Sequence, residues 1–215
     1  MLPSRPEPFH DEFISSYLYR LARENGRTVG SFLKSSEIEA IINGNYAYLC
    51  QLTGFNKDIF LATFYNKFNR LLLYNIGLSK DPRESWFARE TIKVCPFCFR
   101  EEQYYRIHWK MHFSFSCTKH KLFLVRRCPK CSARLKDMSF GNILPLGICH
   151  KCKAEITDLP IIPIDNFEKI EMQNAFDQLL HAANLNSQVV IKTVEHIADL
   201  YWYLKDLFPN EDPYS

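Results

Sequence analysis

The chain has 215 residues, of which 47% are hydrophobic and 14% aromatic, a composition typical of a folded protein and not of a disordered tail. Neither its N-terminus nor apolar runs such as Leu71-Leu72-Leu73 resemble a signal core or a membrane span, so we expect a cytoplasmic protein without a membrane partner. The formal charge of +3 falls to zero if seven cysteines are thiolates on two zinc ions, so it indicates no particular partner.

The distribution of charge is more informative than its sum. Residues 93–136 contain eleven Lys and Arg and two acidic residues, whereas residues 155–215 contain three Lys and eleven acidic residues. A basic segment can bind phosphate or an acidic protein surface, and charge alone does not distinguish the two.

Short helices are predicted in the first 90 residues. The first has apolar residues at positions 13, 14, 17, 18 and 21, with Asp11 or Ser15 as its cap, and Asn25-Gly26 ends it. Further short helices are expected at 29–34, at 46–52 before Gly54, and after Asn56. This pattern fits a helix-turn-helix arrangement and equally any small helical bundle.

The pattern changes after a predicted linker at 77–92. Cysteine pairs, short β-like runs and basic residues follow, and beyond Pro163 two amphipathic helices are predicted at about 166–183 and 187–207. We therefore predict a mainly α fold with small zinc-bound α+β units. Its expected domains are an N-terminal helix-turn-helix-like domain (1–90), a double zinc-finger domain (91–158) and a C-terminal helical pair (159–215).

The strongest chemical signal is a series of four ligand pairs with the spacing of zinc ribbons. Within each pair a two-residue gap lets one tight turn direct two ligands at one ion, and loops of eighteen and seventeen residues bring the second pair of each unit back. Tetrahedral zinc needs four such ligands. We predict two structural Zn²⁺ sites, one formed by Cys95, Cys98, Cys117 and His120, and the other by Cys128, Cys131, Cys149 and Cys152.

Other interpretations of these residues stay open at this point. The first and third pairs could share an ion, or the cysteines could be free thiols with one redox pair. Cys50 lies outside the pattern and is interpreted as a small buried hydrophobe. His108 and His112 are four residues apart, but Trp109 stands where a metalloprotease has Glu, so we interpret them as packing residues, with a third metal site as the alternative.

No pattern in the sequence indicates catalysis. Four protein ligands would fill each zinc coordination sphere and leave no position for an activated water. No glycine-rich loop of the kind that binds ATP phosphates is present either. We therefore expect a protein that is not an enzyme.

Three groups of residues resemble the TniQ family of transposition target-selection proteins. They are the N-terminal run Arg5–Glu12 with Ser15–Ala22, the aromatic run Tyr104–Trp109, and the paired zinc motifs in their order. The resemblance covers about residues 3–155. No motif matches residues 156–215.

The resemblance implies an N-terminal helix-turn-helix domain joined to a zinc-finger domain. It also implies a role in Tn7-like transposition, in which family members link a target-recognition complex to an AAA+ regulator. In CRISPR-associated transposons that complex is an RNA-guided effector, whereas members of the TnsD type bind an attachment site directly and have long C-terminal regions. Because the tail here is only about 60 residues, we expect an adaptor, with autonomous site-specific DNA binding as the alternative.

Basic residues around the zinc motifs are the predicted contacts to a protein partner or to DNA or RNA in the assembly. An Arg held beside a zinc-binding turn suits phosphate or carboxylate, although solvated surface charge is the alternative interpretation. The candidates are Lys119, Lys121, Arg126, Arg127, Lys130 and Arg134, together with Arg20 and Arg23 on the polar face of the first helix.

Overall fold

The fold is known from a computed structural model, which describes residues 1–61, 90–111, 114–139, 141–158, 163–164, 170–171, 173–175 and 178. Within the predicted helix at 166–183, the structure describes residues 170–171, 173–175 and 178, all of them helical. The predicted helix at 187–207 and His112 lie outside the described residues, as does most of the predicted linker. Over the described part of the chain, no helix is long and apolar enough to cross a bilayer.

In residues 1–61 the structure describes four short α-helices. They are α1 (Ile14–Glu24), α2 (Ser35–Ile42), α3 (Ala47–Thr53) and α4 (Lys57–Leu61), with a 3₁₀ turn, η1 (Val29–Ser31), between the first two. Gly26 and Gly54 follow α1 and α3 with φ of 63° and 75°, left-handed values that glycine adopts without strain. The predicted helix at 29–34 is only a 3₁₀ turn, and α2 was not predicted.

The two residues predicted to cap α1, Asp11 and Ser15, form hydrogen bonds to other parts of the chain instead. Phe13 is the N-cap residue, and it makes no side-chain cap hydrogen bond. The Ser15 hydroxyl donates to Asp137 at 2.6 Å, and the Asp11 carboxylate accepts from the Tyr104 hydroxyl at 2.7 Å. These two polar side chains therefore join the N-terminal helices to the metal-motif segment.

The segment after residue 90 combines single helical turns with two small antiparallel sheets, in line with the predicted α+β units. Among the residues described between 90 and 158, its helical elements are α6 (Pro96–Glu101), η2 (Ile107–Lys110) and η3 (Ile156–Asp158). Strands β1 (Ser116–Cys117) and β2 (Leu122–Phe123) pair with Cys117 opposite Leu122. Strands β3 (Met138–Ser139) and β4 (Asn142–Ile143) pair with Met138 opposite Ile143.

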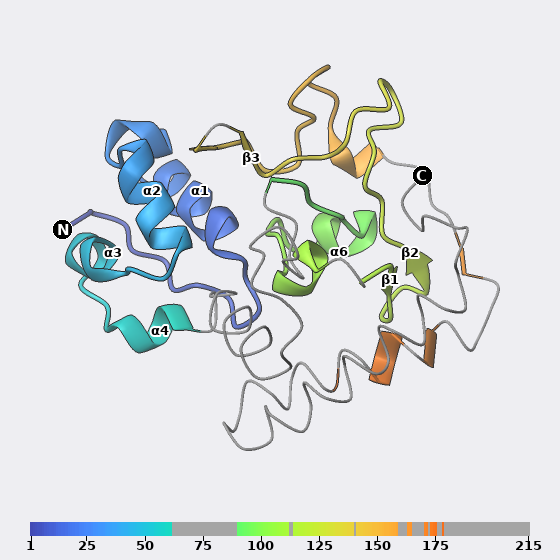
Figure 1. The fold of residues 1–215 in the computed structure, drawn as a ribbon, viewed down its shortest axis with the longest axis horizontal. Coiled ribbons are helices and arrows are strands. Elements are labelled where there is room, and N and C mark those ends of the chain that lie inside the picture. Colours follow the sequence, from blue (N-terminus) through green and yellow to red (C-terminus); the bar gives the residue numbers. More distant parts are fainter. Residues whose placement is uncertain are drawn as a thin grey trace, which may run out of the picture.

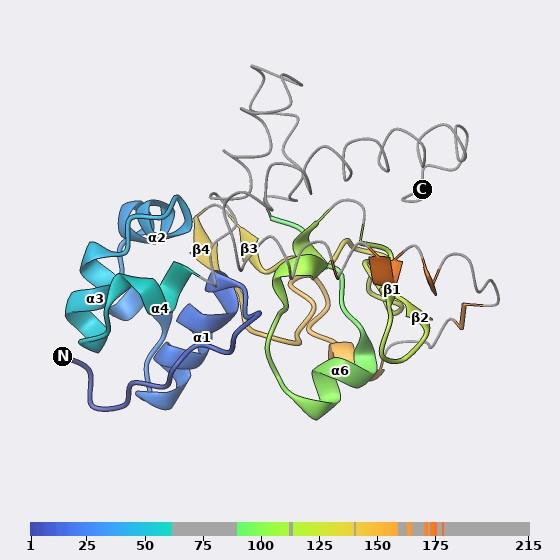
Figure 2. The same cartoon turned by 90° about the horizontal axis from the view of Figure 1, so that it is seen from below.

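The two parts lie side by side and share contacts. Helices α1–α4 occupy one end of the molecule, whereas α6 and the β1–β2 hairpin lie toward the other end (Figure 1). The β3–β4 hairpin reaches back to the N-terminal helices, where β4 contacts α1 and η1 (Figure 2). A segment from the metal-motif half thus completes the packing of the helical half.

One hydrophobic core runs through both parts. It contains the fully buried side chains of Tyr17, Tyr105 and Trp109, and its buried members extend from Leu2 to Ile156. Backbone hydrogen bonds also cross between the parts, with Phe13 N–H donating to the Tyr105 carbonyl at 2.7 Å. Buried residues on both sides of residue 90 therefore belong to the same core.

A buried ion pair lies at the junction. Lys110 Nζ donates to Asp137 Oδ1 at 2.6 Å, and the two side chains are 0% and 1% exposed. Burial raises the pKa of Asp137 and lowers the pKa of Lys110, while the attraction between the two charges opposes both shifts. With the Ser15 hydroxyl on its other oxygen, the Asp137 carboxylate holds α1, η2 and the segment before β3 together.

Gly147 marks a second close contact, between α6 and the loop that precedes Cys149. Its φ is 71°, and its N–H donates to the Tyr105 hydroxyl at 2.9 Å. A Cβ atom at this position would stand 2.5 Å from Phe99 Cε1, well inside van der Waals contact. Only glycine lets this loop lie against α6.

We expect Asp137→Ala to lower the free energy of unfolding by about 3–5 kcal/mol, because it leaves the Lys110 ammonium buried without its partner. Urea unfolding of metal-loaded protein measures the loss. The double variant Asp137→Ala/Lys110→Met should recover part of it, since the unpaired charge is then gone. A single variant within about 1 kcal/mol of the parent protein would contradict the assigned role of the pair.

We also expect Gly147→Ala to cost more than Gly26→Ala. Gly26 has a similar φ of 63° but nothing within 4 Å of its added Cβ, so its substitution costs only the left-handed strain of about 1–2 kcal/mol. At Gly147 a displacement of Phe99 adds about 1–3 kcal/mol. Denaturant midpoints of the two variants give the comparison, and equal losses would show that the Phe99 contact is unimportant.

Candidate metal centres

The eight predicted ligands lie in two groups of four. In each group the candidate ligand atoms are all within 4.8 Å of one another. The first centre comprises Cys95, Cys98, Cys117 and His120, and the second comprises Cys128, Cys131, Cys149 and Cys152. The grouping follows the order of the chain, so it differs from the alternative in which the first and third pairs share an ion.

The first centre is built by a helix start and a hairpin. Cys95 is the N-cap residue of α6, Pro96 occupies the first turn, and Phe99 N–H donates to the Cys95 carbonyl at 3.0 Å. This turn brings Cys98 to the same side as Cys95. Cys117 ends β1, and His120 lies in the turn that leads to β2.

The second centre is built by two similar turns. Ser132 N–H donates to the Cys128 carbonyl at 2.7 Å, and Lys153 N–H donates to the Cys149 carbonyl at 3.0 Å. In each turn the residue after the second ligand is left-handed, with φ of 56° at Ser132 and 61° at Lys153. Lys121 repeats this conformation after His120, with φ of 54°. The same backbone conformation therefore follows three of the four ligand pairs.

The distances between ligand atoms fit tetrahedral zinc. His120 Nδ1 lies 3.2–3.5 Å from the three sulfurs of the first centre, and sulfur pairs in the two centres are 3.5 and 3.7 Å apart. With Zn–S of about 2.3 Å and Zn–N of about 2.0–2.1 Å, a tetrahedron places its ligand atoms about 3.5–3.8 Å apart. All eight cysteines are free, and a disulfide would need about 2.05 Å. Either centre could hold a metal ion.

The thiols of the first centre compete for ionisation. Hydrogen bonds from Cys117 and Cys98 lower the pKa of Cys95, whereas the contacts with Cys117 and Cys95 raise the pKa of Cys98. A divalent cation would favour the thiolate at every sulfur and remove this conflict. The donor set, three sulfurs and one imidazole, is among those that zinc adopts in structural sites.

A carboxylate that the sequence reasoning did not single out lies against the first centre. Glu101 Oε1 is 3.2 Å from His120 Nε2, the ring nitrogen that faces away from the sulfurs. Lys119 Nζ donates to the other oxygen of Glu101 at 2.5 Å. The position of Glu101, at the end of the helix that carries the first two ligands, is the signal that could have revealed it.

The predicted basic residues divide among several places. Lys119 pairs with Glu101 beside the first centre, Lys121 is exposed in the turn before β2, and Arg126 is half-buried. Arg127, Lys130 and Arg134 lie on the turns of the second centre. Lys151 and Lys153, which were not among the predicted contacts, lie on the same turns. We call this set the basic turn surface, and its exposed members are Arg127, Lys130, Arg134, Lys151 and Lys153.

Arg20 contacts the chain itself. Its guanidinium donates to both carboxylate oxygens of the buried Glu12, at 2.9 and 2.7 Å, and stacks on the Phe9 ring at 4.4 Å. Phe9 in turn stacks on Tyr104, with 4.4 Å between ring centroids. The two sequence runs noted above therefore pack on each other as one cluster. Arg23 is exposed, and its guanidinium lies 3.4 Å from the side-chain oxygen of Gln103.

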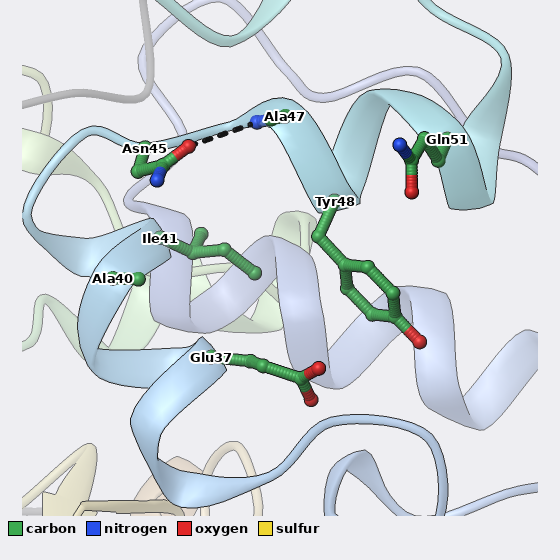
Figure 3. Close-up of a pocket in the computed structure, with 7 residues that line it drawn as sticks. All are labelled: Glu37, Ala40, Ile41, Asn45, Ala47, Tyr48 and Gln51. Carbon is green, nitrogen blue, oxygen red and sulfur yellow. Dashed lines mark hydrogen bonds between the residues drawn. The ribbon is translucent and has the colours of Figure 1, made fainter.

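A shallow groove of about 280 Å³ lies between α2 and α3 (Figure 3). Its lining includes Tyr48 and Gln51 from α3 and the carboxylate of Glu37 from α2, and Asn45 accepts a hydrogen bond from Ala47 N–H at 3.3 Å. The helices are joined by a four-residue turn that contains Gly44. Neither helix contains Lys or Arg, so this surface is poorly suited to phosphate.

Comparison with known proteins identifies a family for this arrangement. The sequence model of the TniQ family matches residues 3–124, a span that includes the four N-terminal helices and the first metal centre and ends just after β2. The second centre lies beyond the match. A search of curated proteins found no match. Because the matched residues make up more than half of the chain, the protein belongs to the TniQ family.

Proposed function

We propose that the protein is a transposition adaptor, which links a target-recognition complex containing an RNA-guided effector to an AAA+ regulator on DNA. Membership of the TniQ family implies a role in transposition target selection. The proposal adds that both metal centres hold structural Zn²⁺ and that the chain binds other molecules without transforming them. Four protein ligands at each centre support this, because they leave no coordination position for a reacting water.

The main support for the adaptor role is the composition of the surface formed by α2 and α3. We propose that these helices form the helix-turn-helix element that the family resemblance implies. Such an element reads DNA with exposed side chains of its second helix and with cations on flanking phosphates. Here the exposed residues of α3 are Ala47, Tyr48 and Gln51, and α2 adds carboxylates. This composition favours contact with a protein over contact with a phosphate backbone.

The basic turn surface favours a second candidate function, site-specific DNA binding. Its five exposed cations lie on two turns whose residues, 127–134 and 148–155, include a single carboxylate, that of Glu155. Such a surface attracts nucleic-acid phosphates, although phosphate contacts alone carry no sequence information. We therefore propose that this surface contacts the phosphate backbone of DNA within the assembly. Recognition of a specific DNA sequence is the alternative.

Binding measurements with the purified zinc-loaded protein separate the two functions. The adaptor should retain the AAA+ regulator in a pull-down and bind DNA alone only weakly, with a dissociation constant of about 10⁻⁴–10⁻⁶ M that is the same for scrambled duplexes. A site-specific binder would prefer one sequence by about 4–10 kcal/mol without any partner. That preference, or failure to retain the regulator, would contradict the adaptor role.

Charge reversal tests the basic turn surface. We expect Lys130→Glu/Arg134→Glu to weaken binding to DNA, and the neutral pair Lys130→Ala/Arg134→Ala to reduce the slope of log affinity against log salt by about 2. The matched control is Arg27→Glu/Lys57→Glu, which makes the same charge change at exposed residues of the helical part. Equal effects of the two charge reversals would show that only net charge matters.

Metal analysis tests the zinc assignment. We expect two equivalents of zinc in the parent protein and one in Cys131→Ser, with a lower melting temperature, because a lost ligand removes metal-linked folding energy. Cys50→Ser is the control, since Cys50 belongs to neither centre and should leave both equivalents in place. Fewer than two equivalents in the parent, or unchanged zinc in Cys131→Ser, would contradict the assignment.

A further inference from the structure

The ligands of the first centre differ in how well they are shielded. The three cysteines are at most 5% exposed, whereas the side chain of His120 is 18% exposed and its Nε2 faces outward. Metal loss by a closed site begins when one ligand leaves the ion and water or a chelator takes its place. The imidazole is the ligand that solvent reaches most easily. The rate at which it dissociates from the metal therefore limits the lifetime of the bound metal.

A neutral imidazole can bind a metal through Nδ1 only if the ring carries its proton on Nε2. The carboxylate of Glu101 lies where it can accept a hydrogen bond from that proton, with 3.2 Å between Nε2 and Oε1. Carboxylates in this position fix the tautomer and orientation of the ring and raise its basicity as a ligand.

Lys119 fixes the carboxylate in turn. Its ammonium lies 2.5 Å from Oε2, so Oε1 stays turned toward the imidazole. The Phe97 ring lies against the imidazole, with 5.3 Å between the ring centroids, and restricts its movement further. The charge of Lys119, which the sequence reasoning assigned to partner contact, is therefore engaged beside the metal centre.

We propose that Glu101 is a positioning residue of the first metal centre, whose carboxylate holds the His120 imidazole in the orientation that keeps the metal bound. This inference rests on the proposed zinc at that centre. It assigns Glu101 no direct bond to the metal, because the three sulfurs and Nδ1 complete the tetrahedron.

Zinc transfer from the intact, fully loaded chain to a chromogenic chelator tests the proposal. We expect Glu101→Ala to weaken one of the two zinc equivalents by about 10- to 100-fold and leave the other unchanged, with Glu101→Gln intermediate because it keeps an oxygen but loses the charge. The matched control is Glu102→Ala. Glu102 is the neighbouring carboxylate, 52% exposed, and lies 3.5 Å from Arg106 and not against a ligand.

The same measurement in a His120→Cys background shows whether the effect acts through the imidazole. A fourth thiolate has no tautomer to fix, so Glu101→Ala should then change zinc retention less than twofold. Equal effects in the two backgrounds, or zinc release from Glu101→Ala at the rate of Glu102→Ala, would overturn the proposal. A parent protein that binds fewer than two equivalents would instead refute the proposed zinc sites.

Discussion

The ion pair between Lys110 and Asp137 constrains how the two halves of the molecule sit against each other. Both side chains are almost completely buried, and Ser15 on α1 supplies the remaining hydrogen bond to the carboxylate. Burying one of these charges without its partner costs several kcal/mol of folding free energy. The three segments that meet here, α1, η2 and the residues before β3, therefore pack together cooperatively. Metal ions bound at the two candidate centres would fix the short loops that lead to these residues, which the two-residue strands could not fix alone.

The family match ends at residue 124, yet the fold of the matched part depends on residues beyond it. Asp137 completes the buried ion pair, Leu135 accepts a hydrogen bond from Ile92 N–H at 3.0 Å, and Gly147 packs against Phe99. The second centre is therefore not a separate appendage. Its basic turns are held at a fixed position relative to α2 and α3, as the proposed adaptor, which contacts two partners at once, would require.

The features that the sequence predicted correctly depend on residues close together in the chain. The ligand groups follow from the spacing within and between the four pairs, and the ends of α1 and α3 follow from Gly26 and Gly54. The features that the sequence did not predict depend on tertiary contacts. Arg20 looked like an exposed cation on a helix, because nothing local shows that Phe9 and Glu12 fold over it. The contacts of Glu101 and Asp137 likewise depend on partners that lie 18 to 122 positions away along the chain.

The charge of the second centre also bears on function. Four thiolates on one Zn²⁺ carry a charge of about −2, and together with Glu155 they offset more than half of the five cations of the basic turn surface. A net charge of about +2 weakens the attraction of this surface for phosphates, and its five cations are fewer than the six to ten phosphate contacts of strongly salt-dependent DNA binders. A surface that looks strongly basic in the sequence is thus only moderately basic once the metal is bound. In the proposed adaptor, such a surface would orient the protein on DNA that other components have already selected and would contribute only weak DNA binding by itself.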